Sequence, residues 1–242
     1  MKKIFIDEFI EETTETVVIK GEDYRHLKVF RVKPDDRFII TGKENNEFHA
    51  RIKDINHDSI TMQIIERFSR TNDKYYKLTL YFAVLKGDKN EFIIQKATEI
   101  GIDSLVPVIT DRTIVDLNSE KQTSRQNRWQ KTAKEAAMQS GVTSIPNVKP
   151  IVKFKSVLED NEHRLKFYGE INGDTGFDLS SLSNTGESIA VFIGPEGDFS
   201  EKEFELLKQN GWKGVGFNTG ILKSDTAAIY TISVLNYLLT NR

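Results

Sequence analysis

From Leu78 onward the sequence alternates short apolar runs with amphipathic stretches, and this rhythm limits the possible folds more than any other feature. Strands are predicted at residues 78–84, 104–109, 165–168, 188–193 and 214–217. Helices are predicted at residues 88–101, 124–140, 200–210 and 225–239. Strands that alternate with helices indicate a parallel sheet covered by helices. We therefore expect an α/β domain over residues 74–242.

The first 70 residues follow a different pattern. Period-two alternation predicts strands at residues 16–20, 37–41, 47–55 and 59–66, around a short helix at 23–30. Turn sequences such as Pro34-Asp35-Asp36 separate these strands. The pattern indicates a small β-barrel over residues 1–70. The polar stretch at 68–77 lacks periodicity and marks the boundary between the two domains.

Composition excludes several kinds of site. The chain contains no cysteine, which removes disulfides, thiolate metal ligands and cysteine nucleophiles. Its four histidines show no i, i+4 pair, so no metal site is expected. No run approaches the roughly 18 apolar residues of a membrane span. Asp7 and Glu8 fall where a signal peptide needs an apolar core. We therefore expect a cytoplasmic protein without a membrane partner.

Two loops are candidates for ligand binding, because each joins a predicted strand to a predicted helix. The first is Gly194-Pro-Glu-Gly-Asp-Phe199, which precedes a helix start with Ser200 and Glu203 at capping-box spacing. Its glycines predict either positive φ or close approach of the backbone to another group. The second is Phe217–Thr226. In open α/β folds, ligands bind at the carboxyl ends of the strands. A purely structural turn is the alternative for the first loop.

The sequence FNTGILKSDT of the second loop brings a cation, hydroxyls and a carboxylate to a helix N-terminus, which favours an anion. Neither loop has the GxxxxGK[ST] spacing of a Walker motif, and the nearby GWKGVGFNTG lacks dinucleotide-binding spacing. The helix at 88–101 has its own start and stop signals: Asp88 with Glu91 in a capping box, and Gly101 beyond its end.

Five segments, in this order, resemble the RsmE family of SPOUT-class methyltransferases, which act on the N3 position of a uridine in small-subunit ribosomal RNA. They are LKGDKNEFIIQKATEIG at 85–101, RWQKTAKEAAMQS at 128–140, Ile145-Pro146, Gly194-Pro-Glu-Gly197 and GILKSDTA at 220–227. His26–Arg31 (HLKVFR) extends the resemblance into a PUA-like RNA-binding barrel. The resemblance thus covers nearly the whole chain.

The resemblance implies a PUA-like β-barrel followed by a SPOUT α/β domain with a deep trefoil knot, S-adenosylmethionine as cofactor, and a homodimer with the cofactor pocket near the subunit interface. The implied substrate is 16S ribosomal RNA or the assembled small subunit. By resemblance the two loops hold the cofactor, and the expected cofactor-binding residues are Ile193, Gly194, Glu196, Gly197, Asn218, Thr219, Gly220, Ile221, Leu222 and Thr226.

Charge and resemblance together predict an RNA-binding surface. Its residues would be Arg25, His26 and Arg31 on the barrel, Lys86, Lys89 and Lys96 near the first helix of the α/β domain, and Arg128 and Lys134 on its long helix. Taken alone, a charged cluster is usually a solvated face. The formal net charge of the chain is −2, which does not by itself indicate a nucleic-acid partner.

The chain departs from the family pattern at its presumed catalytic site. The family motif resembles LGxRILRxETA, whereas this chain has Gly220 and Lys223 in place of the two arginines and Asp225 in place of the glutamate. Val142 stands where the family has a third arginine. Lysine keeps the charge but lacks the planar, bidentate guanidinium. We expect Lys223 to be the electrophilic catalytic group, with Asp225 as a base or an orienting residue.

Three functions remain open from the sequence. The first is an active uridine-N3 methyltransferase; methylation at N3 requires no covalent cysteine adduct, which suits a chain without cysteine. The second is a SPOUT-like RNA-binding protein with lost or altered catalysis. The third is an unrelated nucleotide-binding enzyme.

Overall fold

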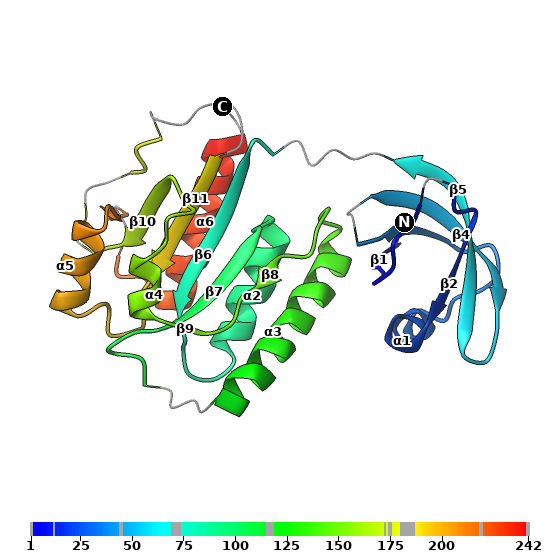
Figure 1. Ribbon diagram of the computed structural model, residues 1–242, viewed down its shortest axis with the longest axis horizontal. Helices are drawn as coiled ribbons and strands as arrows, with labels where there is room; N and C mark the ends of the chain where they lie inside the picture. The colour runs from blue at the N-terminus through cyan, green and yellow to red at the C-terminus, as the bar shows by residue number, and fades with distance from the viewer. Residues whose placement is uncertain are drawn as a thin grey trace. The chain divides into compact units, whose positions relative to one another are not determined.

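The computed structural model divides the chain into two compact units, residues 1–73 with 137–144, and residues 74–136 with 145–242 (Figure 1). The structure describes residues 2–11, 13–43, 46–68, 74–114, 119–171, 173, 176–179, 187–217 and 220–240.

The first unit is a curled five-stranded sheet with one helix. Its elements are β1 (Lys2–Phe5), β2 (Thr16–Lys20), α1 (Gly21–Val29), β3 (Arg37–Thr41), β4 (Glu47–Ile55) and β5 (Ser59–Phe68). The strand order is β1-β3-β4-β5-β2, with β1 parallel to β3 and the other neighbours antiparallel. Leu27 of α1 is fully buried in the same core as Ile40, Ile52 and Ile60 of the sheet. This core follows from the period-two alternation of the strands.

The second unit is a seven-stranded sheet in which every described pairing is parallel. The main path runs β12-β10-β11-β6-β7-β8, and β9 also pairs with β7. The strands are β6 (Tyr76–Ala83), β7 (Ser104–Ile109), β8 (Asn147–Val148), β9 (Val152–Lys153), β10 (Leu165–Gly169), β11 (Glu187–Ile193) and β12 (Lys213–Val215). The helices are α2 (Lys89–Ile100), α3 (Ser119–Ser140), α4 (Phe154–Leu158), α5 (Glu201–Gln209) and α6 (Ser224–Thr240).

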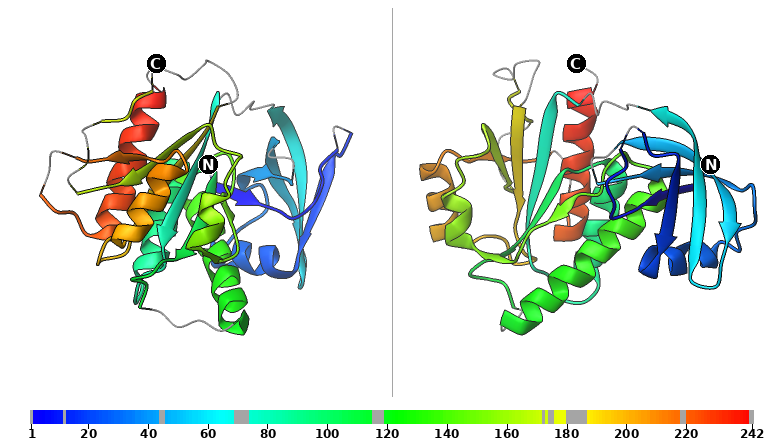
Figure 2. Two further views of the ribbon diagram at one scale, coloured as in Figure 1. Left: turned by 60° about the vertical axis from the view of Figure 1, so that its left-hand side comes forward. Right: turned by 45° about the vertical axis from the view of Figure 1, so that its right-hand side comes forward.

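Helices cover both faces of this sheet (Figure 2). On β6, Leu80 and Phe82 pack in one cluster with residues of α2, α3 and α6, whereas Tyr81 belongs to a second cluster with residues of α4 and α5. Because neighbouring side chains of a strand point to opposite faces, both faces of a doubly covered sheet must be apolar. This explains why the buried strands read as nearly continuous hydrophobic runs.

Short elements were missing from the sequence prediction. β8 and β9 have two residues each and α4 has five, too few for a periodic pattern to show. β1 was also missed, although it lies beside β3. The helix α2 ends as expected, because Gly101 adopts a left-handed φ of 91°. Its expected capping box is wrong: Asp88 makes no side-chain cap hydrogen bond, and Glu91 instead accepts a hydrogen bond from Trp129 Nε1 at 3.1 Å.

Two kinds of feature are absent from the described part of the chain. Within it, none of the helices combines the length and apolar character needed to cross a membrane. The same residues contain no group of three histidine, aspartate or glutamate side chains placed to hold a metal ion.

Candidate active site

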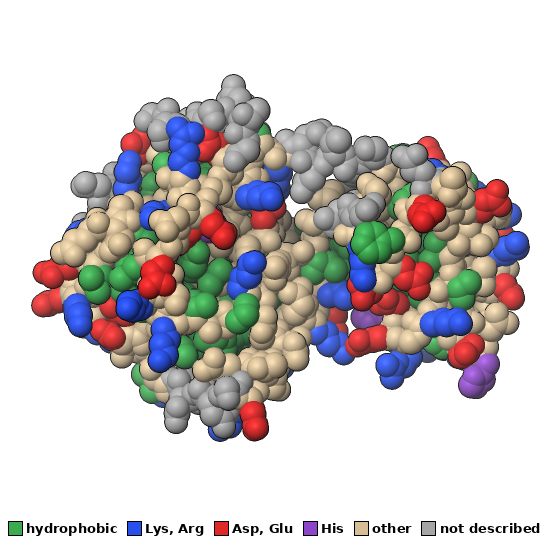
Figure 3. Space-filling view, in the orientation of Figure 1, with side chains coloured by type: hydrophobic (Ala, Val, Ile, Leu, Met, Phe, Trp, Pro, Cys, Tyr) green, Lys and Arg blue, Asp and Glu red, His purple; other side chains and the backbone are tan. Residues whose placement is uncertain are grey.

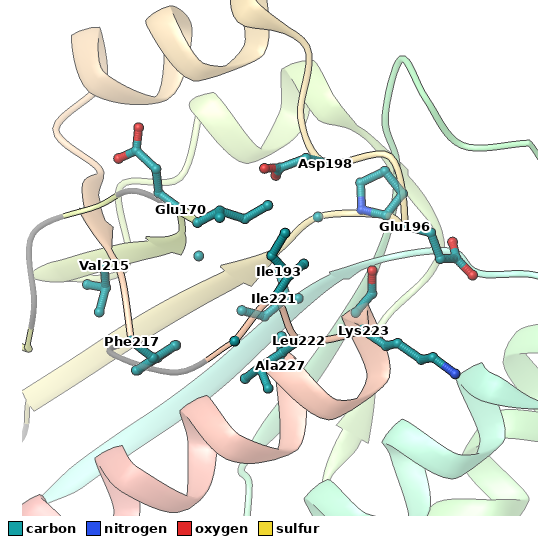
Figure 4. A pocket seen from close by; sticks show the side chains of 16 residues that line it. Glu170, Ile193, Glu196, Asp198, Val215, Phe217, Ile221, Leu222, Lys223 and Ala227 are labelled. Atoms are coloured by element: carbon teal, nitrogen blue, oxygen red, sulfur yellow. The ribbon is translucent and has the colours of Figure 1, made fainter.

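A cavity of about 250 Å³ lies at the carboxyl ends of β10, β11 and β12, next to the start of α6 (Figure 4). Its lining comes from residues 169–171 after β10, residues 193–196 and 198 after β11, residues 215 and 217 at β12, and residues 220–224 and 227 leading into α6. The two loops that the sequence indicated therefore share one pocket. A third segment, which follows β10, completes it.

The loop between β11 and α5 is held by close packing. Neither Gly194 nor Gly197 has positive φ. The residue of this loop with positive φ is Asp198, at 62°. Gly194 is instead a site of close approach, since an added Cβ would lie 3.2 Å from the ring of Phe199. Phe199 is buried, with its ring centroid 4.7 Å from that of Phe192. The expected capping box of α5 is confirmed, with Ser200 and Glu203 in reciprocal hydrogen bonds.

The segment after β7 braces this loop from outside the cavity. Arg112 donates a hydrogen bond from its guanidinium to the carbonyl of Gly197. Asp111 accepts a 2.9 Å hydrogen bond from Ser200 Oγ, and its backbone N–H donates to Glu203 at 2.9 Å. The sequence prediction did not include Arg112. The available signal was that Arg112 follows the carboxyl end of β7, a strand that pairs with β6.

An ion pair links the loop to the start of α2. Lys89 Nζ lies 2.6 Å from Glu196 Oε1, and both side chains are partly exposed. Burial acts to raise the pKa of Glu196, but the hydrogen bond and the charge of Lys89 outweigh it, so this pKa is lowered. The hydrogen bond that Lys89 donates to Glu196 raises the pKa of Lys89. Both groups are therefore charged near neutral pH.

Glu170 and Asp198 line the cavity on the side away from Lys223 (Figure 4). Glu170 accepts a hydrogen bond from Tyr168 Oη at 3.2 Å, and Lys208 Nζ lies 3.3 Å from its other oxygen. Burial raises the pKa of Asp198; the backbone N–H of Phe199 opposes this shift, and the charge of Glu170 adds to it. Sequence reasoning missed Glu170 because it belongs to no recognisable motif, and it did not include Asp198 among the site residues although the predicted loop at 194–199 contains it. Glu170 does follow a buried parallel strand, which was the available signal.

The start of α6 supplies the cation of the pocket. Lys223 is exposed and lines the cavity, and Ser224 beside it is buried. Asp225 does not line the cavity, and its Oδ1 is buried without a hydrogen-bond partner. A helix N-terminus also favours negative charge through its unpaired N–H groups. The arrangement can therefore stabilise an anion that forms beside Lys223.

The predicted cofactor residues separate into three groups. Those that line the cavity are Ile193, Gly194, Glu196, Gly220, Ile221 and Leu222. Gly197 and Thr226 lie in the same segments but are exposed and outside the lining. Asn218 and Thr219 fall outside the described residues. Of the two predicted catalytic residues, only Lys223 reaches the cavity wall.

The predicted RNA-binding residues lie on both units. In the first unit, Arg25 and His26 belong to α1, and Arg31 follows it with φ of 50°. In the second unit the predicted residues are Lys86, Lys89, Lys96, Arg128 and Lys134. Lys96 pairs with Glu99 at 2.9 Å and Arg128 with Glu91 at 3.0 Å. On the face shown in Figure 3, basic and acidic side chains are interspersed.

Comparison with known proteins identifies both units. Residues 19–65 match the family described as the RNA methyltransferase PUA domain, and residues 72–236 match the RNA methyltransferase domain. The chain is 31% identical to ribosomal RNA small subunit methyltransferase E of Bacillus subtilis, over 98% of this chain and 96% of that protein. The chain belongs to the ribosomal RNA small subunit methyltransferase E family. The expected fold class, a PUA-like unit followed by a SPOUT α/β unit, is thereby confirmed.

Members of this family share both length and structure with the chain. A Borreliella burgdorferi methyltransferase E is 29% identical over 99% of this chain and 98% of its own length. The crystal structure of the Neisseria gonorrhoeae methyltransferase E bound to S-adenosylmethionine is 27% identical, covers 98% of each chain and has a TM-score of 0.86. Membership in this family makes the chain an RNA methyltransferase.

Proposed function

We propose that this protein transfers a methyl group from S-adenosylmethionine to N3 of a uridine in 16S ribosomal RNA. The observation that carries the proposal is the pocket at the carboxyl ends of β10, β11 and β12, in a chain whose 27% identical relative binds S-adenosylmethionine. The family name supplies the small-subunit RNA, and the resemblance supplies the N3 position.

The residues of the pocket fit this cofactor. Ile193, Val215, Leu222 and Ala227 give the cavity apolar walls that suit an adenosine. The loops at residues 193–196 and 220–222 present backbone groups, which can hydrogen-bond an adenine edge or a ribose. Carboxylates on the other side suit a positively charged ligand. When bound, S-adenosylmethionine supplies an activated methyl group on a positively charged sulfur.

Lys223 would act on the uridine. Methylation at N3 requires the imide proton to leave, and the resulting negative charge spreads to the flanking carbonyl oxygens. An ammonium carried by a residue of the pocket wall can stabilise charge that develops in the transition state. Asp225, two residues further along, would orient this group or accept the proton. The chain has no cysteine, and this chemistry needs no cysteine adduct.

The proposal includes a homodimer. Tyr230, Tyr237 and Leu238 are exposed on α6 by 40%, 68% and 38%, and Ile221 at the pocket is 81% exposed. Tyr230 and Tyr237 are seven residues apart on α6 and so lie on one face of it, and exposed apolar side chains that share a face favour a protein partner. A second copy covering α6 would place the pocket near the interface. Sedimentation measurements that find only a monomer at micromolar concentration would contradict this part of the proposal.

The remaining family features enter the proposal together. They are a trefoil knot in the C-terminal segment, action in the cytoplasm, and either naked ribosomal RNA or the assembled small subunit as substrate. Knots are rare in proteins, so no local sequence pattern would suggest one.

A second candidate function is an RNA-binding protein with lost or altered catalysis. It is favoured by the absence of three family arginines, whose places are taken by Val142, Gly220 and Lys223. Calorimetry with S-adenosylmethionine separates the two functions. A catalyst must bind the cofactor, whereas undetectable binding would favour the second function.

The decisive experiment is methyl transfer from labelled S-adenosylmethionine to isolated small subunits and to naked 16S RNA, followed by nuclease mapping of the product. We expect label in N3-methyluridine at one site. Incorporation into another nucleoside, or none in either substrate while S-adenosylmethionine binds, would contradict the proposed reaction.

A further inference from the structure

One side of the pocket carries two carboxylates that the proposed reaction does not use. In Figure 4, Glu170 and Asp198 lie on one side of the cavity, and the side chain of Lys223 extends away from them on the other. Glu170 comes from the end of β10 and Asp198 from the loop after β11. One side of the pocket therefore carries two carboxylates, of which Glu170 also pairs with Lys208 of α5.

The position of Glu170 is fixed by its neighbours. Tyr168 Oη donates to one carboxylate oxygen at 3.2 Å, and Lys208 Nζ lies 3.3 Å from the other. Burial and the charge of Glu170 raise the pKa of Tyr168, which keeps its hydroxyl protonated as a donor. On β12, an added Cβ at Gly214 would lie only 2.1 Å from Glu170 Oε2. The absence of a side chain at Gly214 leaves the space that this carboxylate fills.

Asp198 is held beside it against a conformational preference. Its φ of 62° lies in the left-handed region, which an L-residue adopts at a cost. Its carboxylate accepts a hydrogen bond from the backbone N–H of Phe199 at 2.8 Å. A strained residue that lines a cavity suggests a role for its side chain. The role open to a second carboxylate here is to strengthen the negative charge of this side.

We propose that Glu170, supported by Asp198, recognises the positively charged sulfur of the methyl donor and lets the pocket discriminate the donor from its demethylated product. This inference rests on the proposed function. Methyl transfer breaks the sulfur–methyl bond and leaves its electron pair on sulfur, while the N3–methyl bond forms and the imide proton passes to a base. The sulfur thereby becomes neutral. A carboxylate near it then loses its attraction, which favours exchange of product for fresh donor.

Calorimetric titration of the full chain with S-adenosylmethionine and with S-adenosylhomocysteine tests this assignment. The two ligands share the adenosine and the amino-acid end, and they differ in the sulfur charge. A hydrogen bond or close contact to a charged group contributes about tenfold or more in affinity. In Glu170→Gln, we expect the affinity for S-adenosylmethionine to fall about tenfold and that for S-adenosylhomocysteine to change less than twofold.

Two further variants complete the experiment. Asp198→Asn should show the same selective loss with smaller size, which keeps the test available if the Glu170 variant folds poorly. Glu205→Gln, an exposed glutamate on α5, is the matched control and should bind both ligands as the wild type does.

The outcomes are distinct. An unchanged affinity ratio in both pocket variants would overturn the role of the carboxylates while leaving the proposed function standing. An equal loss for both ligands would overturn the assignment to sulfur. A wild-type protein that binds neither ligand would overturn the proposed function together with this inference.

Discussion

At the scale of single residues, Asp198 combines two unfavourable features, a left-handed backbone and a partly buried carboxylate with raised pKa. Glycine adopts this φ without a Cβ penalty, so Asp198→Gly should raise the free energy of unfolding by about 1 kcal/mol at pH 7. The pKa of Asp198 is raised in the folded state, so folding favours its protonated form. The stability linked to this protonation is fully present below the ordinary aspartate pKa of about 4, and it is lost as pH rises through the raised pKa.

The increase in the free energy of unfolding caused by Asp198→Gly should therefore be smaller at pH 4 than at pH 7. Urea denaturation at the two pH values measures this difference. Asp35→Gly is a matched control. Asp35 also has a left-handed φ, 70°, and its side chain is 79% exposed in a 3.2 Å ion pair with Arg51, so backbone relief reduced by the small contribution of a surface ion pair is expected. A destabilised Asp198→Gly variant would show that the carboxylate makes a favourable interaction in the free protein.

Lys223 carries the catalytic prediction. Removing one group that stabilises developing charge typically lowers kcat by about 100-fold. Lys223→Ala should show such a loss in methyl transfer with little change in S-adenosylmethionine affinity, and Lys223→Arg should restore part of the rate because it keeps the charge. Lys202→Ala, an exposed lysine of α5, is the control. Equal rates for Lys223→Ala and the control would remove Lys223 from the catalytic role.

Sequence reasoning reached one side of this site and missed the other for a physical reason. Glycine, proline and a helix start mark the loops that contain Gly194 and Lys223, so the chain itself signals a turn there. Glu170 is an ordinary glutamate at a strand end, and only the pairing of β10 with β11 brings it to the cavity. Such a position depends on tertiary structure and leaves no local pattern.

At the scale of elements, the two expected capping boxes show when such a pattern can be trusted. Ser200 forms the box, while Asp88, with the same spacing to a glutamate, does not. Asp88 has φ −86° and ψ 7° rather than the extended backbone of Ser200. Glu91 instead accepts a hydrogen bond from Trp129 Nε1 and forms an ion pair with Arg128. The spacing specifies the donors and acceptors, but the backbone that enters the helix decides whether they meet.

This difference gives a paired prediction. Ser200→Ala removes a cap hydrogen bond of 3.2 Å to the backbone N–H of Glu203, and also the 2.9 Å hydrogen bond to Asp111. It should lower the free energy of unfolding by about 1 kcal/mol. Asp88→Ala should change it by less than about 0.5 kcal/mol. Thermal or urea unfolding of both variants measures the difference, and equal effects would contradict it.

At the scale of the whole molecule, the order and type of the long elements followed from the sequence, because hydrophobic periodicity reports burial directly. The parallel sheet of the second unit and the small β unit at residues 1–70 were both expected from it. The sequence did not predict that β12, β10, β11 and β6 are neighbours in this order. The order of these strands in the sheet differs from their order along the chain, and it reverses at the pocket. The site is built at that reversal, where ligand pockets of open α/β sheets usually lie.

RNA binding is the property that depends on the molecule as a whole. With a net charge of −2, the chain is predicted to bind RNA through local basic clusters. Arg25 is exposed on α1 and is predicted to contact a phosphate. Each phosphate contact contributes about 0.7 to 0.9 to the slope of log affinity against log salt. Arg25→Ala should therefore weaken binding of a 16S RNA fragment and reduce this slope by about that amount.

Lys53→Ala is the matched control, since Lys53 is also exposed in the first unit, on β4. It should leave both the affinity and the slope unchanged if contact is made through α1. Fluorescence anisotropy between 50 and 300 mM salt, at roughly twofold steps, is sufficient to resolve a slope change near one. Equal slopes for the wild type and Arg25→Ala would exclude a phosphate contact by Arg25. A reduced slope in Arg25→Ala and in Lys53→Ala would indicate that the RNA contacts the sheet of the first unit as well as α1.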